Sequence, residues 1–264
     1  MKITLFTSNN YRHNYLINLI SSYCDELFVV QECNTIFPGA IPSIYQVSEI
    51  TLNYFKNVDK AQIKLFGTSY IQNKNKNIRI LPLKMGDLNK CTPQLLKDFL
   101  ESDLYVVFGS SYIKNDLIQF LVNKKAINIH MGVSPFYRGS NCNFWSLYDD
   151  NPHLTGATIH LLSKGLDSGP ILYHAMSKLK EDPFEYTMST VKSAFYSIIE
   201  KINEKSIFDY KPVAQNSSQE IRYSRNSDFN DKIIEEFNNK KINLNSKEFD
   251  ITLLKEPYFY KNID

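Results

Sequence analysis

Cysteine is scarce in this chain of 264 residues, and the four that occur lie far apart. They are Cys24, Cys33, Cys91 and Cys142, so the sequence contains no Cys-x-x-Cys pair. Structural zinc sites need closely spaced ligands, and small disulfide scaffolds need many cysteines. We therefore expect reduced thiols and no bound metal.

An excess of charge of either sign is also missing. Lysine and arginine number 30, aspartate and glutamate number 28, and the formal net charge is +2. The segment 205–264 repeats this balance, with ten basic and ten acidic residues. Binding to nucleic-acid phosphates depends on a basic surface. We expect a small-molecule substrate and no nucleic-acid partner.

Long apolar runs are absent as well. No stretch reaches the roughly eighteen apolar residues that identify a membrane-spanning helix, and the chain begins at once with a strand-like segment, Lys2–Thr7. Such a start differs from the long apolar segment of a signal peptide. We predict a cytoplasmic protein without membrane insertion.

The chain does contain a regular alternation of strand-like and helix-like segments. Strands are predicted at Ile3–Phe6, Leu27–Val30, Ile78–Leu81, Leu104–Phe108, Ala126–Ile129, Gly156–Leu162 and Pro170–Ser177. Helices are predicted at Tyr11–Ser22, Pro93–Glu101, Ile113–Val122, Asn143–Tyr148 and Pro183–Glu204. This order predicts an α/β fold, with a mostly parallel, Rossmann-like sheet and helices on both faces. We assign residues 1–204 to one domain and residues 205–264 to a small C-terminal extension.

The connection between residues 31 and 77 is long for a crossover and is expected to contain a further helix. Apolar residues that include Tyr54, Phe55 and Val58 recur there at roughly helical spacing. We interpret these side chains as core residues and not as ligand contacts.

The most informative segment is 126–139. Asn128 and His130 stand two residues apart at the end of a predicted strand, so their side chains project to the same side. Gly132, Pro135 and Gly139 then turn the chain. Open α/β sheets bind ligands at the carboxyl ends of their strands. The sequence therefore places a polar pair in a cleft walled by loops.

Together with Asp167, this pair suits acyl transfer from an activated donor to an amine. The attack builds an oxyanion and an ammonium, which call for a hydrogen-bond donor and a proton acceptor. Asn128 can donate to the oxyanion, His130 can donate or shuttle the proton, and Asp167 can orient the imidazole. Each residue taken alone is more commonly a turn former or a structural residue. The prediction depends on their combination.

From about Asp103 to about Ala175 the chain resembles the formyltransferases that use 10-formyltetrahydrofolate. Members of that family act on glycinamide ribonucleotide, methionyl-tRNA or sugar nucleotides. The motifs that carry the resemblance are Asn-x-His at Asn128, Pro-x-Tyr-Arg-Gly at 135–139, Gly-x-Thr-x-His at 156–160 and Gly-Leu-Asp-Ser-Gly at 165–169. Ser168 replaces the usual threonine of the last motif. The resemblance implies that Asn128, His130 and Asp167 are catalytic, with no metal and no covalent nucleophile.

The resemblance also implies that 10-formyltetrahydrofolate lies between two chain segments. The residues implied to contact this donor are Phe108, Gly109, Ser110, Ser111, Tyr112, Leu162, Lys164 and Gly165. On physical grounds alone, Gly109 and the two serines can equally be a cap between a strand and a helix.

Acceptor contacts are predicted in three segments. The first turn precedes a helix N-terminus, which attracts phosphate although the turn lacks the glycines of a P-loop; the others are the 135–139 loop and a basic-aromatic segment of the tail. The candidates are Ser8, Asn9, Asn10, Arg12, Tyr137, Arg138, Gly139, Arg222 and Arg225. An ordinary capping turn and, for Arg222 and Arg225, surface salt bridges are the alternatives.

We predict an N-formyltransferase that uses 10-formyltetrahydrofolate and a dTDP-linked amino-dideoxy sugar, as in surface polysaccharide (O-antigen) biosynthesis. Formylation of methionyl-tRNA and hydrolysis of formyltetrahydrofolate are the alternatives. The aromatic cluster in 256–260 is too apolar for water, so it is expected to pack on the core or on a second subunit. A homodimer is predicted.

Overall fold

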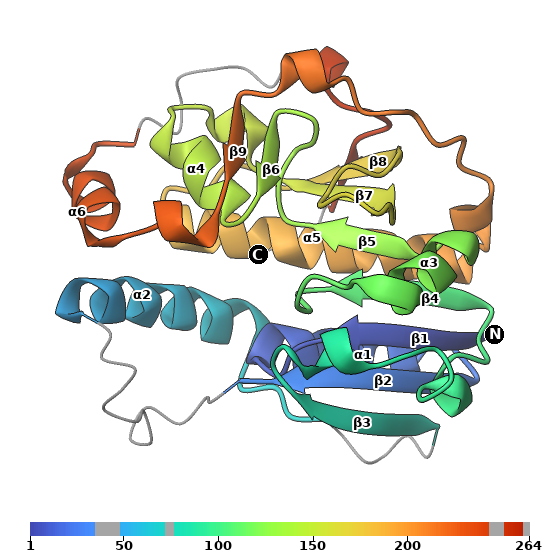
Figure 1. Ribbon diagram of the computed structural model, residues 1–264. Helices are drawn as coiled ribbons and strands as arrows, with labels where there is room; N and C mark the ends of the chain where they lie inside the picture. Colours follow the sequence, from blue (N-terminus) through green and yellow to red (C-terminus); the bar gives the residue numbers. More distant parts are fainter. Residues whose placement is uncertain (35–47, 72–76, 243–250, 261–264) are drawn as a thin grey trace.

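The protein is described from a computed structural model that covers residues 1–34, 48–71, 77–242 and 251–260. Within these ranges the main sheet has eight strands in the order β10-β8-β7-β5-β4-β1-β2-β3 (Figure 1). The strands are β1 (Lys2–Thr7), β2 (Glu26–Cys33), β3 (Ile78–Lys84), β4 (Leu104–Phe108), β5 (Ile127–His130), β7 (Ala157–Leu161), β8 (Ile171–Met176) and β10 (Tyr258–Phe259). Only β7 runs antiparallel to its neighbours, β5 and β8. The predicted α/β fold with a mostly parallel sheet is confirmed.

The order of the central strands creates a ligand-binding edge. From β1 the chain moves outward to β2 and β3, and it then returns to the other side of β1 to form β4 and β5. At such a reversal the loops that follow two neighbouring strands diverge and leave a crevice at the carboxyl ends. The segments after β1, β4 and β5 therefore surround one site.

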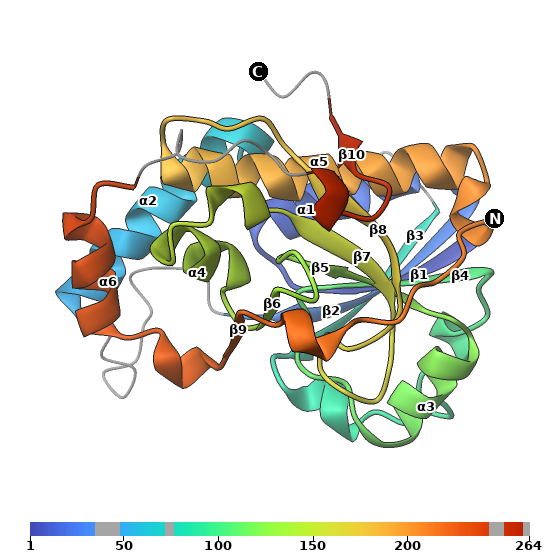
Figure 2. The same cartoon turned by 90° about the horizontal axis from the view of Figure 1, so that it is seen from above.

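Helices cover both faces of the sheet, as Figure 2 shows from above. The helices α1 (Tyr11–Ser21), α2 (Glu49–Phe66) and α5 (Pro183–Asn203) bury apolar side chains in one core cluster with β1, β2 and β4. The opposite face packs against α3 (Asn115–Asn123). The predicted helix in the 31–77 connection is α2; residues 35–47 and 72–76 lie outside the described residues.

Local sequence signals explain the long helix α5. Asp182 caps its N-terminus by accepting hydrogen bonds from the backbone N–H groups of Phe184 and Glu185, both at 2.8 Å. Pro183 occupies the first helical position, where its missing N–H costs no hydrogen bond. The helix then runs for 21 residues beneath β7 and β8.

The predicted helix at Pro93–Glu101 is wrong. Only a 3-10 turn, Lys97–Phe99, forms there. Leu96 and Leu100 are buried in the core cluster that contains α3, while Leu95 is 70% exposed. The backbone N–H groups of Phe99 and Leu100 bond to carbonyl oxygens three residues back, so the segment buries these side chains as a tight turn and not as an α-helix. The other predicted strands and helices correspond to the observed elements.

The residues beyond α5 pack on the rest of the chain. Strand β9 (Arg222–Ser224) pairs with β6 (Tyr137–Gly139), and β10 extends the main sheet beside β8. Helix α6 (Asp231–Asn239) buries Phe237 in a third core cluster with α4 (Cys142–Tyr148). Tyr260 stacks on Tyr196 of α5, with ring centroids 4.1 Å apart. The predicted aromatic cluster thus contacts its own chain, and a dimer stays a prediction.

Candidate active site

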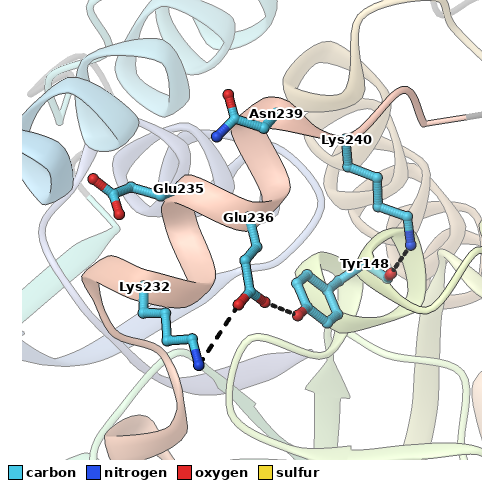
Figure 3. Close-up of a pocket in the computed structure, with 6 residues that line it drawn as sticks. All are labelled: Tyr148, Lys232, Glu235, Glu236, Asn239 and Lys240. Atoms are coloured by element: carbon cyan, nitrogen blue, oxygen red, sulfur yellow. Dashed lines mark hydrogen bonds and ion pairs between the residues drawn. The ribbon is translucent and has the colours of Figure 1, made fainter.

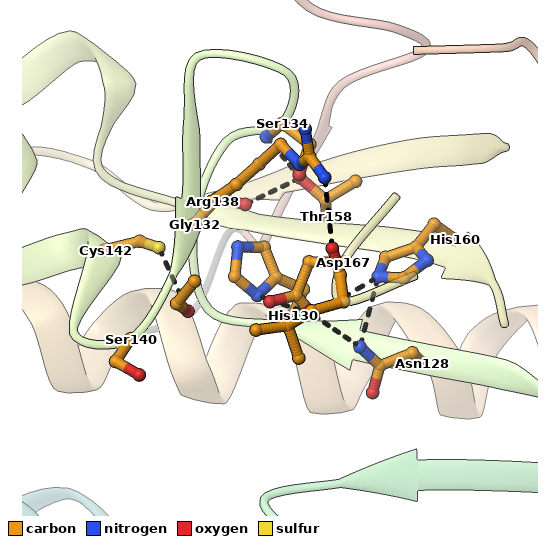
Figure 4. Close-up of polar contacts among 12 residues, drawn as sticks. Asn128, His130, Gly132, Ser134, Arg138, Ser140, Cys142, Thr158, His160 and Asp167 are labelled. Carbon is orange, nitrogen blue, oxygen red and sulfur yellow. Dashed lines mark hydrogen bonds and ion pairs between the residues drawn. The ribbon is translucent and has the colours of Figure 1, made fainter. Parts of the chain in front are cut away.

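Asn128 and His130 occupy the end of β5 on one face, as strand alternation predicts. The antiparallel neighbour β7 places His160 opposite Asn128 and Thr158 opposite His130. Figure 4 shows the side chains of Asn128, His130, His160 and Asp167 directed toward one another. Residues from two strands and one loop therefore form a single polar cluster.

Asp167 lies at the centre of this cluster. Its Oδ1 atom is 3.3 Å from Nδ2 of Asn128, 3.4 Å from Nδ1 of His130 and 3.9 Å from Nε2 of His160. Its side chain is only 10% exposed. The backbone at Asp167 has φ of 46°, in the left-handed region that aspartate tolerates better than most residues. One carboxylate oxygen thus lies within 4 Å of a nitrogen atom from each of three side chains.

His160 is a site residue that the sequence prediction assigned no role. Its Nδ1 atom donates to the carbonyl oxygen of Leu161 at 2.8 Å, so Nε2 is the acceptor for Nδ2 of Asn128 at 3.1 Å. Burial lowers the pKa of His160 from 6.5 to about 4, although the Asp167 carboxylate opposes this effect. His160 is therefore neutral near pH 7. Its only sequence signal was the Gly-x-Thr-x-His motif.

These contacts fix the orientation of the Asn128 amide. Both partners of its nitrogen, His160 Nε2 and the Asp167 carboxylate, are acceptors, so the N–H₂ group faces them. A hydrogen bond from Asn128 to an oxyanion requires the amide to exchange one of these bonds. The bond to Asp167 is the longer of the two.

His130 has an acceptor beside each ring nitrogen. Its Nε2 lies 3.2 Å from the carbonyl oxygen of Tyr137, and its Nδ1 lies 3.4 Å from Oδ1 of Asp167. Both neighbours only accept hydrogen bonds, so the neutral ring can donate to one of them and the protonated ring to both. His130 can therefore accept a proton with an acceptor in place for each of its N–H groups.

The cluster opens into a cavity of about 870 Å³, within the size range of small-molecule sites. Seven of the eight predicted donor contacts line it: Phe108, Gly109, Ser110, Ser111, Tyr112, Leu162 and Gly165. Lys164 does not line the cavity, but its carbonyl oxygen accepts a hydrogen bond from the Tyr112 hydroxyl at 2.7 Å. The two predicted donor-binding segments thus meet.

Only part of the predicted acceptor set reaches the cavity. Ser8, Asn10, Arg12 and Gly139 line it, whereas the others do not. Asn9 pairs with the backbone of Asn34. The ring of Tyr137 is fully buried, with its hydroxyl at Asp149 and Asn151.

The three predicted arginines of the loop and tail have other surroundings. Arg138 binds Glu220 and the carbonyl oxygen of Leu166. Arg222 forms a bidentate salt bridge with Asp149 at 2.6 and 2.8 Å and stacks on Trp145, as the salt-bridge alternative predicted. Arg225 is exposed and lies outside the cavity lining. The arrangement therefore gives these side chains no contact with the cavity.

The cavity also has a wall that the sequence did not reveal. Tyr54, Phe55 and Val58 of α2 line it, together with Asn226 from the tail. Tyr54 contacts five aromatic rings, as a core residue does, but Phe55 is 47% exposed. Helical spacing identified the helix, yet it could not distinguish its buried face from the face turned to the cavity.

A second pocket, of about 590 Å³, lies beside α6 (Figure 3). The residues lining it are Tyr148, Lys232, Glu235, Glu236, Asn239 and Lys240. Its charged groups largely pair with their neighbours: Lys232 with Glu236 at 3.9 Å, and Lys240 with Asp150 at 2.7 Å. No member of the Asn128 cluster lines this pocket, so we place the chemistry in the larger cavity.

Among the residues described here, histidine, cysteine, aspartate and glutamate form no group suited to hold a metal ion. No helix in the same ranges combines the length and apolarity required to span a bilayer.

The fold and site define an α/β protein with a polar cluster and a ligand cavity at the carboxyl edge of a mostly parallel sheet. The model of the formyl transferase family matches residues 93–202, which include the whole cluster. The resemblance seen in the sequence is confirmed for these residues.

Curated relatives are methionyl-tRNA formyltransferases. The protein from Trichodesmium erythraeum is 28% identical over 165 residues, which are 57% of this chain and 48% of the relative. The protein from Thermosynechococcus vestitus is 28% identical over 148 residues, or 51% and 44% of the two chains. The chain thus spans about half the length of the curated relatives it matches.

Solved structures share the fold. A 4-N formyltransferase from Francisella tularensis has a TM-score of 0.53 at 20% identity, covering 86% of this chain and 77% of its own. An N-formyltransferase from Helicobacter canadensis, in complex with folinic acid and dTDP-3-aminofucose, has a TM-score of 0.52 at 15% identity, with 89% and 79% covered. A phosphoribosylglycinamide formyltransferase from Anaplasma phagocytophilum has a TM-score of 0.52 at 16% identity, and the match covers 80% of this chain and 89% of that protein.

Proposed function

We propose that this protein is an N-formyltransferase that moves a formyl group from 10-formyltetrahydrofolate to the primary amine of a dTDP-linked amino-dideoxy sugar. The observation that supports the proposal best is the geometry of the cluster. Asp167 Oδ1 stands within 3.4 Å of both Asn128 Nδ2 and His130 Nδ1, at one cavity. A hydrogen-bond donor and a proton acceptor thus share one reaction site.

The chemistry of the donor wall suits a flat heteroaromatic ring with polar edges. Val107, Phe108 and Leu162 supply apolar surface, and Ser110 and Ser111 add hydroxyl groups beside it. The donor would supply the activated formyl carbon when bound.

The residues of the cluster can carry out each proton and charge transfer that the reaction requires. The lone pair of the neutral amine attacks the formyl carbon, and Asn128 exchanges one hydrogen bond to stabilise the resulting oxyanion. The imidazole of His130 takes the ammonium proton, and the protonated ring then donates to the Asp167 carboxylate and to the Tyr137 carbonyl oxygen. The bond from carbon to N10 of the folate then breaks, and N10 takes up the proton that His130 holds, which releases tetrahydrofolate and the formamide.

The same cavity also has groups that suit an acceptor with an aromatic base and a phosphate. Phe55 exposes a ring for stacking, and Arg12 brings a positive charge to the same space. The Helicobacter canadensis structure was solved with a dTDP-amino sugar. We extend the proposal to a cytoplasmic homodimer that serves surface polysaccharide biosynthesis, with residues 205–264 as its C-terminal extension.

Methionyl-tRNA is the second candidate acceptor, because the curated relatives act on it by name. Against it, the tail from residue 205 has equal numbers of basic and acidic residues. Many phosphate contacts would require an excess of basic side chains.

One assay separates these functions. The protein is incubated with 10-formyltetrahydrofolate and either dTDP-3-amino or dTDP-4-amino sugars, their UDP counterparts, methionyl-tRNA, or no acceptor. Formamide products are detected by mass spectrometry and formate by coupled oxidation. We expect a formylated dTDP-sugar and little formate. Formylation of methionyl-tRNA alone, or formate release without acceptor, would replace the proposal with the corresponding alternative.

A further inference from the structure

The catalytic loop 163–169 holds Asp167 in a backbone conformation that needs support. Its φ of 46° is a sparsely populated region for a residue with a Cβ atom. The loop's own side-chain hydrogen bonds join Ser163 to the Gly165 carbonyl and to Ser168, at 3.0 and 2.8 Å. They do not hold the carbonyl groups on either side of Asp167. Residues outside the loop hold these carbonyl groups.

Gln215, from the C-terminal extension, supplies one such contact. Its Nε2 atom donates to the carbonyl oxygens of both Asp167 and Gly169 at 2.8 Å. The side chain is brought there by a pair of backbone hydrogen bonds between Val213 and Ile171, of 2.7 and 2.9 Å. One amide group thus bridges the carbonyl oxygens of the two residues that flank Ser168.

Arg138 holds the preceding carbonyl. Its Nη2 atom donates to the oxygen of Leu166 at 3.1 Å, and its Nη1 atom is 2.9 Å from Oε2 of Glu220. The Arg138 and Glu220 side chains are 17% and 28% exposed. The tail runs beside β6 at this point, where β9 pairs with it (Figure 1). The tail therefore orients the arginine that reaches the loop.

We propose that Gln215 and the Arg138–Glu220 pair are positioning residues for Asp167, and that the C-terminal extension is in this way a part of the active site. Together they bind the carbonyl oxygens of residues 166, 167 and 169. The contacts keep Asp167 Oδ1 between Asn128 and His130. This inference rests on the proposed function, because it assigns these residues to the same reaction.

The test compares Gln215→Leu and Gln215→Glu with a matched control, Gln219→Leu. Leucine removes the donor, whereas glutamate keeps the shape and turns an acceptor toward two carbonyl oxygens. Gln219 is an exposed residue of the same segment, and its backbone N–H group, not its side chain, makes the hydrogen bond found there within the described residues. We expect kcat to fall roughly 10- to 100-fold in the Gln215 variants, because small misplacements of catalytic groups have effects of this size. The kcat of Gln215→Glu should be lower than that of Gln215→Leu. Both KM values should stay within about twofold, and the control should match wild type.

A double-mutant cycle decides whether Gln215 acts through Asp167. In an Asp167→Asn background, Gln215→Leu should lower kcat less than about twofold further. A full additional loss there, or wild-type kcat in both Gln215 variants, would overturn the inference.

Hydrogen exchange of the substrate-free protein tests the contacts without turnover. Amides of residues 163–169 should exchange faster in Gln215→Leu, with unchanged protection in α5. If wild type formylates no nucleotide sugar, the proposed function fails, and the exchange result still decides whether Gln215 holds the loop.

Discussion

The neutral, buried His160 predicts a specific loss of stability in acid. Burial lowers its pKa from 6.5 to about 4 in the folded protein. As pH falls below 6.5, the unfolded chain gains a proton on this residue that the folded chain does not bind until about pH 4. The contribution of neutral His160 to stability is therefore fully present above pH 6.5 and is lost as the pH falls toward 4. Each unit of difference in pKa corresponds to about 1.4 kcal/mol, so His160 lowers the free energy of unfolding by about 2 kcal/mol between pH 8 and pH 5.

His160→Gln removes this titration and keeps an oxygen that can accept from Asn128. We expect the difference in unfolding free energy between pH 8 and pH 5 to be smaller by about 2 kcal/mol in the variant than in wild type. Urea unfolding is followed through Trp145, the single tryptophan, which is buried. Comparison of two pH values within each protein cancels any constant effect of the substitution.

Burial also lowers the pKa values of His13 and His174, so both proteins should keep a residual loss in acid. Parallel pH profiles for wild type and His160→Gln would refute the argument that His160 is held neutral by burial.

Four further outcomes are expected. Asn128→Ala and His130→Ala should each lower kcat by roughly two to four orders of magnitude with little change in thermal unfolding, and Asn123→Ala, on the exposed end of α3, is the control; near-normal turnover would remove the assigned role. Arg222→Ala should destabilise the fold by about 1–2 kcal/mol, since its salt bridge is partly exposed, without changing acceptor KM; a raised KM would restore its predicted part in substrate binding. Phe55→Ala should raise acceptor KM severalfold and spare donor KM, because one stacked ring contributes about 1–3 kcal/mol; equal changes in both values would argue against its place on the acceptor side. Acceptor KM should vary little between about 50 and 200 mM salt, because a small substrate makes few phosphate contacts; a steep dependence would favour a tRNA substrate.

The sequence by itself predicted most of the fold, because strand and helix periodicities are local. The alternation from Ile3 to Ile129 defined the parallel sheet, and Asp182 with Pro183 marked the start of α5. It failed at Pro93–Glu101, where the apolar spacing fits a helix but Leu96 and Leu100 are buried by a 3-10 turn, which a local pattern does not distinguish from a short helix.

In the site, the sequence placed Asn128 and His130 together, since residues two apart on a strand share a face. Asp167 followed from the resemblance to known formyltransferases. Local pattern could not show that His160 lies opposite Asn128, because that depends on the register between β5 and β7.

Tertiary structure alone decided what the arginines and the tail contact. Arg138 lies 28 and 82 residues along the chain from its partners, Leu166 and Glu220. The corresponding separation is 73 residues for Arg222, and 46 and 48 residues for Gln215. A charged or amide side chain carries no local signal of its partner, because the geometry of its hydrogen bonds is set by whichever segments the completed fold brings beside it.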